Sequence, residues 1–104
     1  MKRGEVWWAD MAAPVGRRPV LLISRNAAYA VRESVTVGTI TRRIRRLPTE
    51  VRVGRAEGLP EESVVNLDDI ATIPKAQLLN YAGELSNDKL AAVDSAIKFA
   101  LALS

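Results

Sequence analysis

The sequence of 104 residues predicts an α+β fold that is mainly β, a small and strongly curved barrel with appended helices. Two observations lead to this prediction. Short segments rich in β-branched and aromatic residues recur along most of the chain, separated by glycine, proline and charged residues. The last segment instead repeats apolar residues at helical spacing. A chain of this length can form one domain with its own core, so we expect residues 1–104 to be a single domain.

The first half of the chain contains three expected strands. Residues 5–9 are bulky β-forming residues, and residues 19–24 are a continuous apolar run of the kind that is buried on both faces of a sheet. Residues 34–41 alternate apolar and polar side chains, which also favours a strand. Proline and glycine predict a loop at residues 11–17, and residues 26–30 can form a helical turn.

Shorter strands follow an arginine-rich segment that ends at a proline. Residues 50–53 alternate, so the two valines of this segment should face inward. Residues 54–60 are rich in turn formers, and residues 63–67 are the next expected strand. Residues 70–73 can form a further strand that ends at a proline, whereas residues 79–85 stay ambiguous.

The end of the chain predicts an amphipathic helix over about residues 87–103. Ser86 is a suitable N-cap, because its hydroxyl can accept hydrogen bonds from free amides of the first turn. Leu85 and Leu90 stand at the positions of a hydrophobic staple around this cap. The apolar residues that recur at helical spacing are Leu90, Val93, Ile97, Ala100 and Leu101.

The charges of the chain are strongly polarised. All eleven arginines lie within residues 1–55, where 12 cationic and 4 anionic side chains give a net charge of +8. Residues 56–104 contain 3 cationic and 8 anionic side chains, a net charge of −5, and are expected to serve as scaffold and dimer support. Because guanidinium groups match phosphate oxygens in a bidentate manner, the basic half indicates nucleic acid binding. A merely solvated basic surface is the alternative.

Several classes of protein are excluded by what the sequence lacks. Without cysteine there is no disulfide framework and no thiolate metal site, which fits a reducing, cytoplasmic location. The absence of histidine removes the commonest metal ligand and general acid–base group, and leaves Ser24 and Ser63 without an activating base. No apolar run is long enough for a membrane span or a signal peptide. The adjacent carboxylates at residues 61–62 and 68–69 would point to opposite faces of a strand, which disfavours a two-metal site.

Two groups of arginines stand at strand ends. Arg17 and Arg18 precede the buried strand at residues 19–24, while four more arginines follow Thr41, at the end of another strand. If these strands are neighbours, Arg18 and Thr41 meet at one end of the sheet and can form a phosphate-sized pocket. Alternatively, Arg18 caps a loop carbonyl and Thr41 is only a strand residue. Trp7 and Trp8 point to opposite faces, so one can fill the core while Trp8 stacks on a base or lies in an interface.

Such a site has chemistry available without metal or histidine. RNA carries its own nucleophile, the 2′-hydroxyl, so a protein can cleave it by aligning that oxygen with the phosphorus and stabilising the charged transition state. DNA lacks this hydroxyl, and its hydrolysis normally requires a metal-activated water. The residues therefore favour RNA over DNA as the substrate.

Four blocks of sequence, in order, resemble the MazF/PemK family of toxin endoribonucleases from type II toxin–antitoxin modules. The blocks are residues 3–10 (RGEVWWAD), 18–24 (RPVLLIS), 39–41 (TIT) and 58–65 (GLPEESVV). Residues 67–78 and the terminal helix extend the resemblance over essentially the whole chain.

The resemblance implies an SH3-like barrel, a homodimer, and cleavage of single-stranded RNA that requires neither metal nor cofactor and leaves a 2′,3′-cyclic phosphate and a 5′-hydroxyl. The family's catalytic arginine directly precedes the proline of the second block and corresponds to Arg18, which would neutralise the developing phosphorane and shuttle a proton. The catalytic threonine corresponds to Thr41, which would hydrogen-bond the scissile phosphate. Arg17 remains an alternative for the phosphate contact. The residues expected to bind the rest of the RNA are Arg17, Arg42, Arg43, Arg45, Arg46 and Trp8.

Two other functions remain open at this stage. One is a gyrase poison of the CcdB type, which shares the barrel but needs no RNA-cleaving site. The other is an inactive RNA-binding relative that keeps only the basic surface. A toxin of this kind also implies a cognate antitoxin, whose flexible acidic segment would cover the arginines and block access of RNA.

Overall fold

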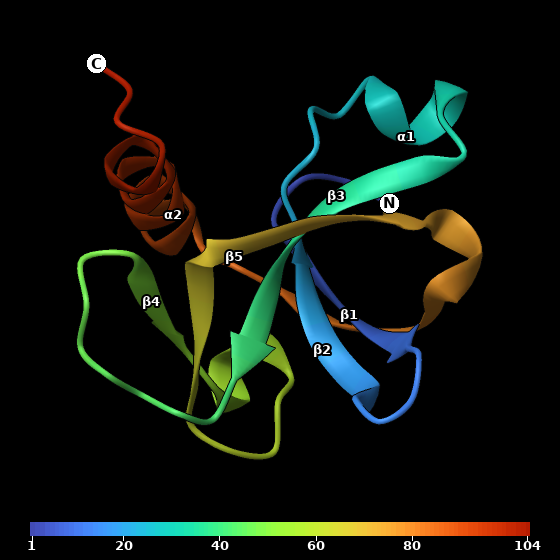
Figure 1. Ribbon diagram of the computed structural model, residues 1–104, viewed down its shortest axis with the longest axis horizontal. Coiled ribbons are helices and arrows are strands. Elements are labelled where there is room, and N and C mark those ends of the chain that lie inside the picture. The colour runs from blue at the N-terminus through green and yellow to red at the C-terminus, as the bar shows by residue number, and fades with distance from the viewer.

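A six-stranded antiparallel sheet, with the strand order β4-β5-β3-β2-β1-β6, curls into a half-open barrel in the computed structural model of residues 1–104 (Figure 1). The fold class predicted from the sequence is therefore confirmed. Helix α2 lies against one side of the barrel, and the short helix α1 lies at the upper end of Figure 1. The strands are β1 (Glu5–Met11), β2 (Gly16–Leu22), β3 (Ser34–Thr41), β4 (Glu50–Val53), β5 (Ser63–Pro74) and β6 (Leu78–Glu84); the helices are α1 (Ala28–Val31) and α2 (Asn87–Ala100), with 3-10 turns η1 (Arg55–Glu57) and η2 (Lys75–Gln77).

The boundaries differ from the sequence-based prediction in three places. Residues 11, 16 and 17 of the segment predicted as a loop belong to β1 and β2, so the connection between these strands is a shorter hairpin turn of residues 12–15. The ambiguous segment near residue 80 is the edge strand β6, which pairs with β1. The two strands predicted at residues 63–67 and 70–73 form the single strand β5.

Strand β5 remains continuous because it bulges where a break was expected. Its register against β3 shifts between Gly38, which pairs with Ile70, and Thr39, which pairs with Asn66. The three intervening residues 67–69 leave the ladder, and Leu67 at their start is buried beside Gly38. Bulges bend a strand and redirect its side chains, which here turns Asp69 toward the cavity described below.

Helix α2 begins as predicted and ends three residues earlier than expected. The Ser86 hydroxyl accepts a hydrogen bond from the Lys89 amide at 3.2 Å, which confirms the N-cap. At the other end, Ala102 adopts a left-handed conformation with φ of 56°, and the Leu103 amide donates to the Lys98 carbonyl oxygen. This closure satisfies terminal carbonyls and stops the helix. Neither helix has the length and apolar character needed to cross a membrane.

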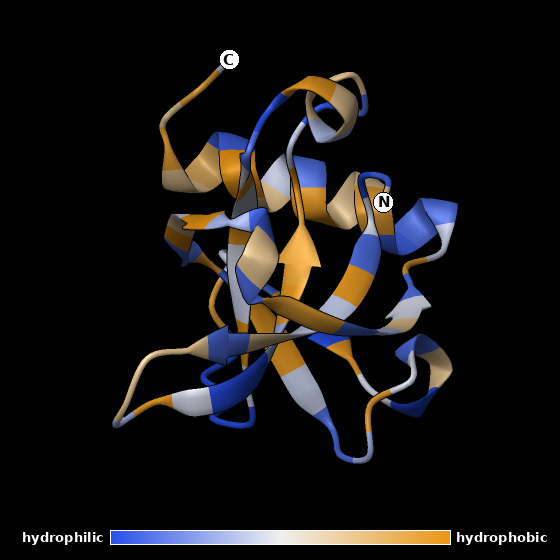
Figure 2. Ribbon diagram, turned by 90° about the vertical axis from the view of Figure 1, so that its right-hand side faces the viewer, coloured by the Kyte–Doolittle hydropathy of each residue, from blue (hydrophilic) through white to orange (hydrophobic).

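The curled sheet separates two groups of buried apolar side chains. The larger group lies between the sheet and α2 and includes Val6, Leu21, Ile40 and Val93, whereas the smaller group includes Val20 and other residues from the opposite faces of β1–β3. Val51 and Val53 face the larger group, as predicted. Figure 2 shows hydrophobic residues in the middle of the central strands and along the length of α2.

The open side of the half-open barrel is bridged where the chain at η1 crosses β6 with the two backbones in close approach. A side chain at Gly58 would collide with the Ala82 carbonyl, and one at Gly83 would collide with the Glu57 carbonyl. Glu57 itself is buried, accepts a hydrogen bond from the Gly54 amide at 2.7 Å, and pairs with Lys89 at 2.6 Å. The charged hydrogen bond between Glu57 and Lys89 therefore links the crossing of η1 and β6 to the start of α2.

Candidate active site

Neighbouring strands bring Arg18 and Thr41 to the same end of the sheet. Strands β2 and β3 pair antiparallel, with Val20 opposite Thr39 at one end of the ladder, and Arg18 and Thr41 both lie just beyond this end. The strand neighbourhood predicted from the sequence is thus present. This end of the sheet lies in the lower half of Figure 1, where the β1–β2 turn and the arrowhead of β3 diverge from each other.

Two cavities meet at this pair of residues. The Trp8 cavity, of about 570 Å³, is also lined by Trp8, Arg17, Arg42 and Glu61. The Asp69 cavity, of about 400 Å³, is also lined by Thr39, Arg45, Asn66 and Asp69. The residues that line both cavities are Val15, Arg18, Pro19, Ile40, Thr41 and Arg43. A chain-like ligand that runs from one cavity to the other therefore passes Arg18 and Thr41.

Both side chains are free to bind a ligand. Arg18 is exposed and makes no hydrogen bond or ion pair with another residue, so the alternative in which it caps a loop carbonyl is wrong. The Thr41 hydroxyl accepts a hydrogen bond from the Arg43 amide at 3.2 Å. Because a hydroxyl has only one hydrogen, accepting this bond leaves that hydrogen available to donate outward. The pair thus presents a guanidinium and a hydroxyl donor to the same two cavities.

The arginine-rich segment after β3 contributes unequally to the site. Arg43 lines both cavities, Arg42 lines the Trp8 cavity, and Arg45 lines the Asp69 cavity, whereas Arg46 lines neither. Arg42 is paired with Glu61 at 2.7 Å, and the hydrogen bond and negative charge of Glu61 raise the pKa of Arg42. Arg43 is thus the unpaired arginine of this segment that lines both cavities.

Glu50 holds this segment in place and was not identified from the sequence. One of its carboxylate oxygens accepts hydrogen bonds from the amides of Arg45, at 2.9 Å, and Leu47, at 3.4 Å. Its other oxygen is buried without a hydrogen-bond partner. The only sequence signal for this role is a single carboxylate four residues after the last arginine of the run, which equally fits a solvated side chain.

Carboxylates of the acidic half, which the sequence assigns to scaffold and dimer support, also line the two cavities. Glu61 binds Arg42, and Glu62 lies 3.7 Å from Arg52. Asp69 accepts a hydrogen bond from the Thr39 hydroxyl at 2.9 Å within its cavity. Carboxylates therefore stand among the arginines and offset part of their charge.

The chain is similar to known proteins in both sequence and structure. The family described as PemK-like, MazF-like toxin of type II toxin–antitoxin system matches residues 2–101. The chain belongs to this family of toxins. The tertiary structure agrees, since the Mycobacterium tuberculosis toxin MazF-mt6 superposes with a TM-score of 0.89 at 34% identity, over 96% of this chain and 98% of that one.

Other PemK-like, MazF-like proteins are similar over almost their whole length. The probable endoribonuclease MazF5 of Mycobacterium tuberculosis is 38% identical over 100 residues, which are 95% of this chain and 91% of that protein. The structure of an endoribonuclease from a mycobacterial species, in complex with its cognate antitoxin, is 31% identical to this chain and has a TM-score of 0.89. The match covers 100% of this chain and 97% of that chain. The fold and the family are thus established by sequence and by structure.

Proposed function

We propose that this PemK-like, MazF-like toxin is a sequence-selective endoribonuclease that cuts single-stranded RNA and thereby inhibits translation and growth. The observation that carries the proposal is the juxtaposition of Arg18 and Thr41 between two cavities, with both side chains free to bind phosphate. The names of the similar proteins, which include endoribonucleases, support it.

In the proposed reaction, the 2′-oxygen of the RNA attacks the adjacent phosphorus and loses its proton. The 5′-oxygen of the next nucleotide leaves and takes up a proton, which gives a 2′,3′-cyclic phosphate and a 5′-hydroxyl. The guanidinium of Arg18 neutralises the charge that develops on the phosphorane, and the free hydrogen of Thr41 binds a phosphate oxygen. Charge stabilisation and alignment of the reacting atoms supply the rate acceleration, without metal or other cofactor.

The remaining arginines position the RNA. Arg43 stands between the two cavities and binds a phosphate next to the scissile one, while Arg42 and Arg45 contact the backbone on either side. Arg46 lies outside the cavities, so its contribution is limited to long-range attraction.

Cleavage in the presence of a chelator tests this function. Purified protein with EDTA should cut a long single-stranded RNA into discrete fragments whose sites are mapped by primer extension. The new ends should accept phosphate from a polynucleotide kinase without prior phosphatase treatment, because they carry a 5′-hydroxyl. A single-stranded DNA of the same sequence should stay intact, since it has no 2′-hydroxyl. If no discrete fragments form over a range of RNAs, the nuclease function is wrong.

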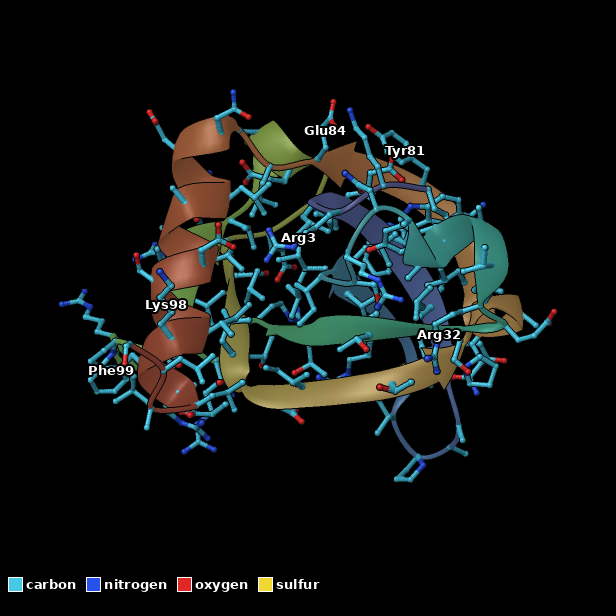
Figure 3. All side chains as sticks on the ribbon, turned by 90° about the horizontal axis from the view of Figure 1, so that it is seen from above. Arg3, Arg32, Tyr81, Glu84, Lys98 and Phe99 are labelled. Atoms are coloured by element: carbon cyan, nitrogen blue, oxygen red, sulfur yellow. The ribbon has the colours of Figure 1, made fainter.

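We further propose that the toxin is a homodimer that is neutralised by a cognate antitoxin. Phe99, on the outer side of α2 in Figure 3, and the nearby Leu101 are exposed apolar side chains that offer surface for a dimer contact. An acidic antitoxin segment would bind over the unpaired arginines Arg18 and Arg43 and exclude RNA.

The electrostatic part of antitoxin binding predicts that the affinity between toxin and antitoxin depends on salt concentration. Raising the NaCl concentration from about 0.05 to about 0.5 M should weaken antitoxin binding by at least about tenfold, because exposed charges are screened. Titration calorimetry at a series of salt concentrations measures this effect. An affinity that does not change with salt would contradict an arginine-covering acidic segment.

A further inference from the structure

Adjacent arginines at the site point to opposite faces of β2. Successive side chains alternate along a strand. Arg18 shares its face with Val20, which belongs to the smaller buried group, whereas Arg17 shares its face with Leu21, which belongs to the larger one. The two guanidinium groups consequently meet different neighbours, although they are adjacent in the sequence.

The guanidinium group of Arg17 lies over an aromatic ring. Trp8 pairs with Pro19 across the β1–β2 ladder and Asp10 pairs with Arg17, so Arg17 and Trp8 are diagonal neighbours on one face. The central guanidinium carbon of Arg17 lies 4.4 Å from the centroid of the Trp8 ring. Arg17 forms no ion pair with Asp10, although the two residues are directly opposite. The contact with Trp8 is therefore a specific cation–π arrangement.

Apart from its contact with Trp8, the Arg17 guanidinium has no side-chain partner. Arg17 is exposed, has no hydrogen-bond partner, and lines the Trp8 cavity together with Arg18 and Thr41. A guanidinium plane that rests on tryptophan on one side presents a flat surface on its other side. RNA bases stack on such guanidinium planes as well as on aromatic rings.

We propose that the Trp8–Arg17 stack is a nucleobase-binding platform, on which one base next to the scissile phosphate stacks against the outer face of Arg17. This inference rests on the proposed function and assigns the two neighbouring arginines separate tasks: Arg18 binds the phosphate, and Arg17 binds a base. Stacking is tolerant of sequence because every base has a π-face. The platform therefore fixes the position of the RNA without selecting the base at this position.

Binding of an uncleavable RNA tests the platform. A single-stranded oligonucleotide with 2′-O-methyl riboses lacks the nucleophile, and its affinity is measured by fluorescence anisotropy. In a series that carries one abasic residue at successive positions around the mapped cleavage site, one position should weaken binding to the native protein by about tenfold. In the Arg17→Ala variant, the same abasic residue should change affinity less than about twofold, because the stacking partner is already gone. Replacing the base at that position by each of the other three should change the native affinity less than about threefold.

The Arg17→Lys variant separates stacking from charge. Lysine keeps the positive charge but lacks the planar guanidinium group, so this variant should lose about as much affinity for RNA as Arg17→Ala. The slope of log affinity against log salt concentration should stay the same as in the native protein, because the charge is kept. In cleavage assays it should raise KM more than it lowers kcat. Arg32→Ala, at the far end of β3 beside α1 (Figure 3), is the matched control and should bind normally.

Two results would overturn the platform: an Arg17→Lys variant that binds as tightly as the native protein, or an abasic penalty that is the same in Arg17→Ala and native proteins. Either result can occur in a protein that still cleaves RNA. Failure of the proposed nuclease function is recognised separately, because the native protein would then leave ordinary RNA uncut.

Discussion

Replacing Arg18 with alanine should lower the rate of RNA cleavage about 1000-fold, and replacing Thr41 with alanine should lower it about 100-fold. Arg18 supplies a full positive charge to the phosphorane, whereas Thr41 supplies one neutral hydrogen bond. Both groups act where charge develops, so kcat should fall more than KM rises. Single-turnover cleavage of a short RNA that contains one mapped site measures these effects.

The folds of both variants should remain intact. Arg18 is exposed and unpaired, and the Thr41 hydroxyl makes one exposed hydrogen bond, to the Arg43 amide. Thermal unfolding of each variant should therefore differ little from that of the native protein. Arg32→Ala removes an equally exposed arginine at the opposite end of β3 and should cut RNA at the native rate. If Arg18→Ala and Thr41→Ala cut normally, the catalytic site has been assigned to the wrong residues.

Replacing Gly58 with alanine should destabilise the protein by about 3–5 kcal/mol, a large part of the roughly 5–15 kcal/mol that stabilises a typical domain. Two costs combine at this position. Its φ of 82° is unfavourable for a residue with a side chain. The added Cβ would also collide with the Ala82 carbonyl of β6, where backbone rather than a movable side chain stands in the way.

Gly16 offers a matched control that separates the steric collision from the conformational penalty. Its φ of 71° is also positive, but a Cβ built on it meets no atom within 4 Å. Gly16→Ala should therefore lose only about 1–2 kcal/mol, the conformational penalty alone. Urea denaturation followed by tryptophan fluorescence compares the two variants. Equal losses for Gly16→Ala and Gly58→Ala would mean that η1 and β6 do not cross at this short distance.

The strands that build the site could be predicted from the local sequence pattern, because the side chains that favour extended backbone locally are also the ones that suit their positions in the folded sheet. The apolar run at residues 19–24 and the alternation at residues 34–41 place Arg18 and Thr41 at strand ends, and antiparallel pairing then brings them together. The sequence predicted two strands, at residues 63–67 and 70–73, where the structure has the single strand β5. The burial of Leu67 beside Gly38 instead keeps the strand continuous and pushes residues 68–69 into a bulge.

The edge strand β6 could not be predicted, for a different reason. Its residues are mostly half-buried or exposed, so they show little alternation. Pairing with β1, through a register that shifts twice, holds the segment in extended form. Contacts between segments far apart in the sequence leave no local pattern from which they can be inferred.

By itself, the sequence determined the mainly β architecture, the terminal helix with its Ser86 cap, and the basic character of the half that contains the site, because each depends on side chains that are close together along the chain. Only the tertiary structure decided which groups the arginines contact. Arg42 is held by Glu61, a residue nineteen positions later, while Arg18 stays free. The alternation of β2 sends Arg17 to Trp8 and Arg18 toward Thr41. A guanidinium binds whichever group lies within a few ångströms of it, and these distances are set by strand register and by the curl of the sheet.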